Sequence, residues 1–244
     1  MKKELLLVSL ASMLMLSSCQ VATMAVEPSF KEQAEEVPVA GRKAFKPNGN
    51  FAIGTYTVAN VNRGWPSVGG FAVAGYENIK ASQKHQFSLQ DGKGHEWYVF
   101  GASKLHEKTL KSNNGISIAV APNLEYYASH FTSPQSGQWH LLTTDPGQYL
   151  RRKEFEGELS NGEVSIKISP VYKAEGKKLP SDDILGYEFM QANERVAAVQ
   201  VINNGKVWLK PGLSEDKRMV LTGAIASLLL YDKLTDVSRE LSLK

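Results

Sequence analysis

The chain offers few side chains for nucleophilic, metal-binding or proton-transfer chemistry. It contains one cysteine and five histidines, which are His85, His95, His106, His130 and His140. A single cysteine forms no internal disulfide and falls short of a cysteine-based zinc cluster. No His-Glu-x-x-His pair, Gly-x-Ser-x-Gly turn or lysine-containing phosphate loop occurs in the sequence. We therefore expect no catalytic residues, no metal site and no cofactor.

The cysteine, Cys19, follows a segment that is typical of secretion signals. Lys2 and Lys3 precede a mostly apolar stretch from Leu5 to Leu16, and a basic end before a short apolar run is the pattern of a signal peptide. The run is shorter than the roughly 20 apolar residues that a permanent membrane-spanning helix needs. We expect residues 1–18 to be removed on export.

The residues around the cleavage point resemble the lipobox of bacterial lipoproteins. They read Leu16-Ser17-Ser18-Cys19, and the resemblance implies that Cys19 carries a diacylglycerol and acyl chains such as palmitate. Several acyl chains together anchor a protein firmly. Gln20 stands where an aspartate would favour the inner membrane of enteric bacteria, so the resemblance implies the outer membrane, with the body facing the periplasm or the cell surface. The alternative is an ordinary signal peptide that is cleaved further on, near Ala25.

Composition and local pattern divide the remaining chain into a spacer and one domain. The net charge is only +3, which gives no strong attraction to nucleic acid. Residues 19–50 are rich in charged residues and prolines and lack a clear period, and we expect a lipidated N-terminus and a flexible tether there. Residues 51–244 are long enough to form a single domain with a sizeable core.

The pattern in this domain predicts many strands and one helix. Alternation of apolar and polar residues indicates strands at 51–56, 87–90, 97–100, 115–120, 164–169, 196–201 and 207–209, with Asn-Gly and Asp-Gly turn signals between several of them. From Ser214 a helix is expected to about residue 234, and Met219–Tyr231 is apolar on all sides. Such a helix must be buried all round. We therefore predict an antiparallel β-barrel that encloses one C-terminal helix. The alternative is a helix packed against one sheet face, as at a dimer interface.

The C-terminal third resembles the tubby C-terminal-like superfamily, which includes tubby-like proteins, phospholipid scramblases and LURP-one-related proteins. The matching features are Val196-Ala197-Ala198-Val199, Val207-Trp208-Leu209, Asp216, the apolar helix and Asp232. The resemblance is clear over Tyr187 to Asp232 and implies a barrel of about twelve strands around a hydrophobic helix. The helix of that superfamily usually ends the chain, whereas Leu234 to Lys244 continue here. No counterpart of the basic lipid-binding residues of tubby proteins is present.

A few residues are weak candidates for ligand contact. The run Arg151-Arg152-Lys153 could touch anionic head groups or phosphates, although a solvated loop has the same composition. Trp65 lies in the loop sequence Asn62-Arg63-Gly64-Trp65-Pro66 and could be an interface anchor or an edge of the core. Tyr126-Tyr127, with His130 and Phe131, could form a stacking patch or simply pack inside.

These observations leave three functional hypotheses. The first is a non-enzymatic binding module of the cell envelope for a lipid, a glycan or an envelope protein. The second is an envelope hydrolase that acts on a cell-wall or surface polymer through scattered carboxylates or histidines, which would require a cleft with a strongly perturbed acid or histidine. The third is a scaffold subunit that braces an envelope assembly through exposed strand edges.

Overall fold

The computed structural model describes residues 22–43, 48–73, 76–111, 117–119, 124–134, 137–146 and 154–235. The strands are β1 (Glu35–Ala40), β2 (Phe51–Ile53), β3 (Tyr56–Arg63), β4 (Ser67–Val73), β5 (Tyr76–Gln90), β6 (Glu96–Lys111), β7 (Ser117–Ala119), β8 (Leu124–Ser133), β9 (Gly137–Asp145), β10 (Glu156–Ser160), β11 (Ser165–Val171), β12 (Gly186–Gln191), β13 (Glu194–Gln200) and β14 (Lys206–Leu209). The helices are α2 (Pro28–Gln33) and α3 (Glu215–Leu230).

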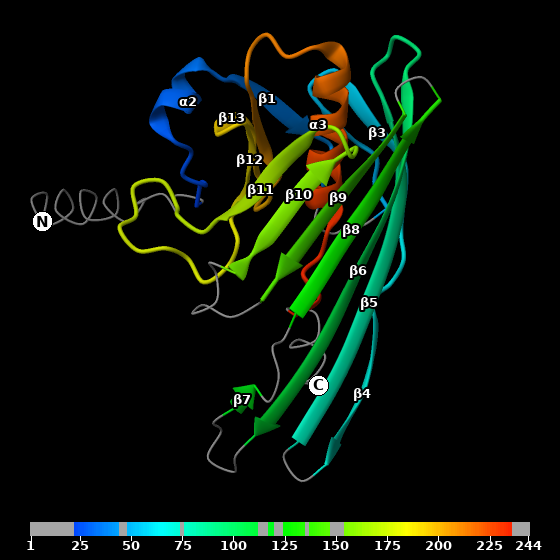
Figure 1. The fold of residues 1–244 in the computed structure, drawn as a ribbon, viewed down its shortest axis with the longest axis vertical. Helices are drawn as coiled ribbons and strands as arrows, with labels where there is room; N and C mark the ends of the chain where they lie inside the picture. The colour runs from blue at the N-terminus through cyan, green and yellow to red at the C-terminus, as the bar shows by residue number, and fades with distance from the viewer. Residues whose placement is uncertain are drawn as a thin grey trace, which may run out of the picture.

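All of these strands belong to one antiparallel sheet that closes on itself (Figure 1). The order is β4-β5-β3-β2-β1-β14-β13-β12-β11-β10-β9-β8-β6-β7, and a further pairing of β5 with β6 completes the ring. Since β4 and β7 stand at the two ends of this order, the closed barrel has twelve strands. Closure leaves the strands of the ring without free edges.

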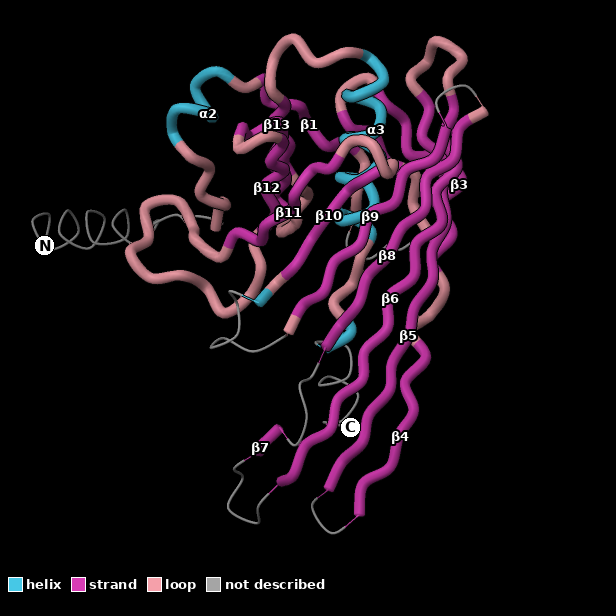
Figure 2. Tube along the Cα trace, viewed as in Figure 1, coloured by secondary structure: helices cyan, strands magenta, loops and turns pink. Residues whose placement is uncertain are grey.

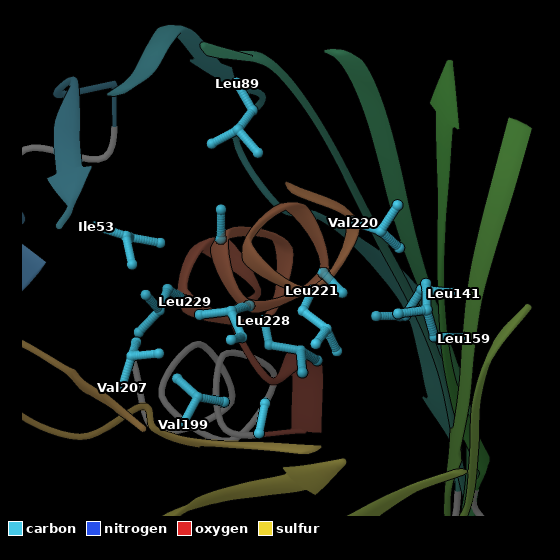
Figure 3. Packing of buried hydrophobic residues seen from close by; sticks show 14 of the residues in the cluster. Ile53, Leu89, Leu141, Leu159, Val199, Val207, Val220, Leu221, Leu228 and Leu229 are labelled. Carbon is cyan, nitrogen blue, oxygen red and sulfur yellow. The ribbon is translucent and has the colours of Figure 1, made fainter. Parts of the chain in front are cut away.

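The helix α3 runs inside this barrel, as the sequence predicts. Ser214 is its N-cap and accepts a hydrogen bond from the amide of Lys217, and Glu215 and Asp216 occupy the first turn. Every residue from Met219 to Leu230 is buried, which rules out packing against a single sheet face. Figure 3 shows helix residues such as Leu221 and Leu229 surrounded by side chains from strands on several sides of the barrel.

One position on the helix shows how tightly it fits. A Cβ atom added at Gly223 would lie 3.3 Å from two ring carbons of Phe131 on β8. The absence of a side chain there lets the helix backbone approach the wall of the barrel. A glycine in a helix interior costs up to about 1 kcal/mol relative to alanine, and the close packing with Phe131 offsets that cost.

Two long strands extend the sheet beyond the ring. Residues 85–90 of β5 pair with β3, whereas residues 76–82 pair with β4. In the same way β6 pairs with β8 over residues 98–106 and with β7 over residues 109–111. The strands β4, β5, β6 and β7 thus form an arm that projects from one end of the barrel (Figure 2).

The expected spacer differs most from the structure, because residues 22–43 are part of the folded body. The strand β1 lies between β2 and β14 in the ring, with Val37 opposite Val207 and Val39 opposite Ile53. Val37 is 6% exposed and belongs to the main core. Pro38 stands between Val37 and Val39 and obscures the alternation of apolar and polar residues in this strand. The charged, proline-rich composition therefore predicts a tether, and this prediction is wrong for residues 22–43. Cys19, the lipid attachment site expected from the sequence, lies outside the described residues.

Candidate functional site

The end of the barrel where α3 terminates is closed by a buried carboxylate. Glu125 on β8 is 1% exposed. It accepts hydrogen bonds from the Tyr231 hydroxyl at 2.5 Å, the Leu234 amide at 2.6 Å, and the Thr235 amide and hydroxyl at 3.0 and 2.8 Å. Burial raises the pKa of Glu125, and the four donors oppose this rise. These four hydrogen bonds hold residues 231–235, which follow the helix, across the end of the barrel.

A buried histidine is connected to this carboxylate through the stacked rings of Tyr127 and Tyr231. The Nε2 atom of His85 on β5 is 3.1 Å from the Tyr127 hydroxyl, which donates to the Ser227 carbonyl at 3.1 Å and accepts from the Ser129 hydroxyl at 2.6 Å. The one proton of the Tyr127 hydroxyl is donated to the Ser227 carbonyl. The hydroxyl oxygen therefore accepts the hydrogen bond from His85 Nε2. Burial lowers the pKa of His85 to about 4, and the nearby charge of Arg63 acts in the same direction.

Ion pairs complete the closure of this end. Arg63 on β3 pairs with Asp232, and Lys233 Nζ lies 3.1 Å from Asp145 on β9. The guanidinium of Arg42 donates to the Leu229 carbonyl from Nε at 3.1 Å and from Nη2 at 2.9 Å, so it caps the C-terminus of α3. The groups with shifted pKa values at this end therefore form hydrogen bonds and ion pairs with other atoms of the chain. This arrangement stabilises the closed end of the barrel.

A second feature lies on the outer face of the barrel, where the sheet carries a depression of about 720 Å³. Burial alternates along β6, β8 and β9, so that even-numbered side chains point outward. Ala102 and Ala128 form the floor, and Phe100 and Leu142, which are 54% and 52% exposed, stand beside them. The volume lies within the range of small-molecule sites, about 300–1,000 Å³.

Polar side chains border this apolar floor on two sides. His130 and His140 face each other across β8 and β9 with their Nδ1 atoms 3.2 Å apart. Lys84 and Gln86 on β5 line the opposite side. The outward ring of Tyr126, on the same face, is 44% exposed. An apolar floor with a few polar groups at its edges can hold a ring or an alkyl chain and orient its polar part.

The structure places the sequence candidates in different surroundings. Trp65 is 90% exposed in the loop between β3 and β4, directly after Gly64, which lines the depression. Of the suggested stacking patch, Tyr126 and His130 point outward, whereas Tyr127 and Phe131 are core residues at 1% exposure. The run Arg151-Arg152-Lys153 lies outside the described residues. Phe100 and Leu142 were missed, although each is a large apolar residue at an outward position of an alternating strand.

The described part of the chain lacks two further features that would point to a function. No helix there is both long and apolar enough to cross a membrane. No group of three or more histidines and carboxylates in the described ranges could hold a metal ion.

Comparison with known proteins gives no further assignment. Neither a protein-family model, nor a curated protein, nor a solved structure matches this chain.

Proposed function

We propose that the chain is a lipoprotein of the bacterial outer membrane, anchored through Cys19, whose barrel is a non-enzymatic binding or scaffold module for a lipid, a glycan or an envelope protein. The leader and lipobox support the anchor. The observation that carries the binding role is the depression on the outer face, with exposed Phe100 and Leu142 above an alanine floor. Large apolar side chains that gather on a surface mark interaction sites.

The packing inside the barrel directs binding to this outer face. The helix α3 and the side chains of the wall form one continuous core, with Leu221, Ala224 and Ile225 at 0% exposure. A ligand therefore meets the protein from outside the barrel rather than within it.

The hydrolase hypothesis receives less support from the geometry. It requires a perturbed acid or histidine that can reach a substrate. Glu125 is 1% exposed and already accepts four hydrogen bonds. His85 borders the depression but is only 6% exposed, and its Nε2 atom lies 3.1 Å from the Tyr127 hydroxyl.

The test is native mass spectrometry of the mature chain, purified gently from its own envelope after enzymatic removal of the acyl chains. We expect a retained mass of lipid or glycan size, and we expect its loss in Ala102→Trp, because an indole on the floor would fill the depression. Lys167→Trp, at an exposed outward position of β11, is the matched control.

The same experiment can contradict the proposal. Equal retention by Ala102→Trp and the wild type would place the ligand elsewhere. A wild-type chain without retained mass would exclude tight small-ligand binding, and crosslinking from Cys introduced at Leu142 would then test for a protein partner.

A further inference from the structure

The described chain begins at a point fixed to the barrel, very close to the proposed anchor. Met24 is 1% exposed in a small core with Leu185, Ala198 and Trp208, and its amide donates to Gln200 Oε1 at 2.8 Å. The Asn203 side-chain amide donates to the Ala22 carbonyl at 3.0 Å. Only Gln20 and Val21 separate Cys19 from Ala22. Three residue steps reach at most about 10 Å, so a lipid on Cys19 would hold this side of the barrel at the bilayer.

One surface loop is joined to this same starting point. The loop 172–185 connects β11 to β12, and its Ala174 forms an isolated β-bridge with Met24. The Ala25 amide donates to the Lys173 carbonyl, and the Glu175 amide donates to the Thr23 carbonyl, both at 2.8 Å. Figure 1 shows this loop in yellow beside the blue start of the described chain.

The tip of the loop has the composition of a membrane contact. Lys177, Lys178, Leu179 and Pro180 are consecutive exposed residues, and Leu179 is 81% exposed. The lysines Lys177 and Lys178 form no ion pair among the described residues, whereas Lys31 is paired with Glu175 at 2.7 Å. The loop's two aspartates, Asp182 and Asp183, follow Pro180 on the return toward β12.

We propose that the tip Lys177–Leu179 is a second membrane contact, which docks onto the anionic head groups of the bilayer that holds the anchor. The lysines attract lipid phosphates, and Leu179 enters the interface, where an exposed apolar side chain leaves water. This inference rests on the proposed lipidation of Cys19, since the anchor brings the tip within reach. The loop then fixes the orientation of the barrel, because two points of contact restrict its rotation more than the anchor alone.

The test uses the full mature lipidated chain, in which Leu179→Cys introduces the only free thiol. The thiol is labelled with an environment-sensitive fluorophore, and the protein is reconstituted into phosphatidylethanolamine–phosphatidylglycerol vesicles. Glu163→Cys is the matched control, because Glu163 is exposed in the turn at the opposite end of the same strand, β11. We expect a blue-shifted emission and quenching by bilayer-embedded spin labels at position 179 but not at position 163.

A charge variant tests the lysines separately. Unlipidated mature chains carrying Lys177→Gln and Lys178→Gln should partition about thirtyfold less onto the anionic vesicles than the unlipidated wild type, since each lysine near the surface contributes about fivefold. The same substitutions should have no effect on phosphatidylcholine vesicles.

The outcomes separate the loop from the anchor. If the lipidated chain floats with vesicles while labels at positions 179 and 163 report the same aqueous surroundings, the loop inference is wrong and the anchor stands. If a chain processed in its own envelope carries no acyl mass and does not float, the anchor is refuted and the loop inference falls with it.

Discussion

The buried histidine provides a prediction whose size follows from the structure. His85 has a pKa of about 4 in the folded chain against 6.5 for the free side chain. Because the folded-state pKa is lowered, the unfolded chain takes up a proton first as the pH falls. The stability that neutral His85 contributes is therefore fully present above pH 6.5 and is lost as the pH falls toward 4. A shift of this size corresponds to about 3.4 kcal/mol in full, and to about 2.5 kcal/mol between pH 7.5 and pH 4.5.

The assay is urea denaturation of the mature chain, followed by tryptophan fluorescence, at several pH values between 7.5 and 4.5. His85→Gln keeps a donor toward the Tyr127 hydroxyl but does not titrate. Carboxylates such as Glu125 titrate in both proteins, so their effect cancels in the difference between the two unfolding free energies. Between pH 7.5 and pH 4.5 we expect the wild type to lose about 2.5 kcal/mol of unfolding free energy relative to His85→Gln.

A matched control and a refuting result define the test. His106→Gln makes the same substitution at an exposed histidine of β6 and controls for the change of side chain itself. Parallel pH profiles for the wild type and His85→Gln would refute the reasoning, because they would mean that the histidine is charged, or equally free to be charged, in the folded chain.

The remaining predictions concern the helix and the closed end of the barrel, and each is measured by urea or thermal unfolding. Glu125→Gln should destabilise the fold by about 2–4 kcal/mol, since an amide NH₂ would face backbone and hydroxyl donors and leave them unsatisfied. Gly223→Leu should cost about 3 kcal/mol because its side chain must enter the space of the Phe131 ring. Arg42→Met should cost about 2 kcal/mol, because the Leu229 carbonyl loses two charged donors at the helix C-terminus.

Each of these variants has a control, either a milder substitution at the same position or the same substitution at an exposed one. Glu163→Gln, at an exposed turn, should leave the unfolding midpoint unchanged. Gly223→Ala should cost much less than Gly223→Leu, since its added carbon needs only a small shift of Phe131. Arg42→Lys should recover only part of the loss, because an ammonium cannot reproduce the fork of the guanidinium. Unchanged stability in Glu125→Gln would show that its hydrogen bonds contribute nothing net.

Much of the barrel was predictable because local signals agreed with the global fold. Turns at Asp91–Gly94, Asn161-Gly162 and Asn203–Gly205 do connect neighbouring strands, and the all-round apolar helix required an enclosing wall. The prediction of one strand over residues 51–56 is wrong at Gly54-Thr55, which form the turn between β2 and β3. The alternation of apolar and polar residues indicates which side of a strand is buried. A turn of two residues leaves this alternation almost unbroken, so the pattern does not reveal the turn.

The candidate site was less predictable because it depends on which strands become neighbours. Phe100, Ala128, His140 and Leu142 come from three strands, and only their register gathers them on one face. The sequence pattern marks each as an outward position but gives no pairing. The hydrogen-bond partners of Glu125 could not be predicted for the same reason, since Thr235 lies 110 residues away in the chain.

The strand β1 shows that the barrel cannot be separated from the segment before it. Among the described strands of the ring, β1 alone links β2 to β14, and its own pairing with β14 joins residues about 170 positions apart, such as Val37 and Val207. A mature chain shortened to begin at Phe51 would lose Val37 from the core and the Arg42 cap, and β2 and β14 would be left two strand spacings apart, too far for direct hydrogen bonds. We therefore expect it to aggregate or unfold at temperatures where a chain that begins at Ala22 is stable, as measured by light scattering and circular dichroism. Equal stability of the two chains would show that the ring can close without β1, and would make residues 22–43 an accessory to the fold rather than part of it.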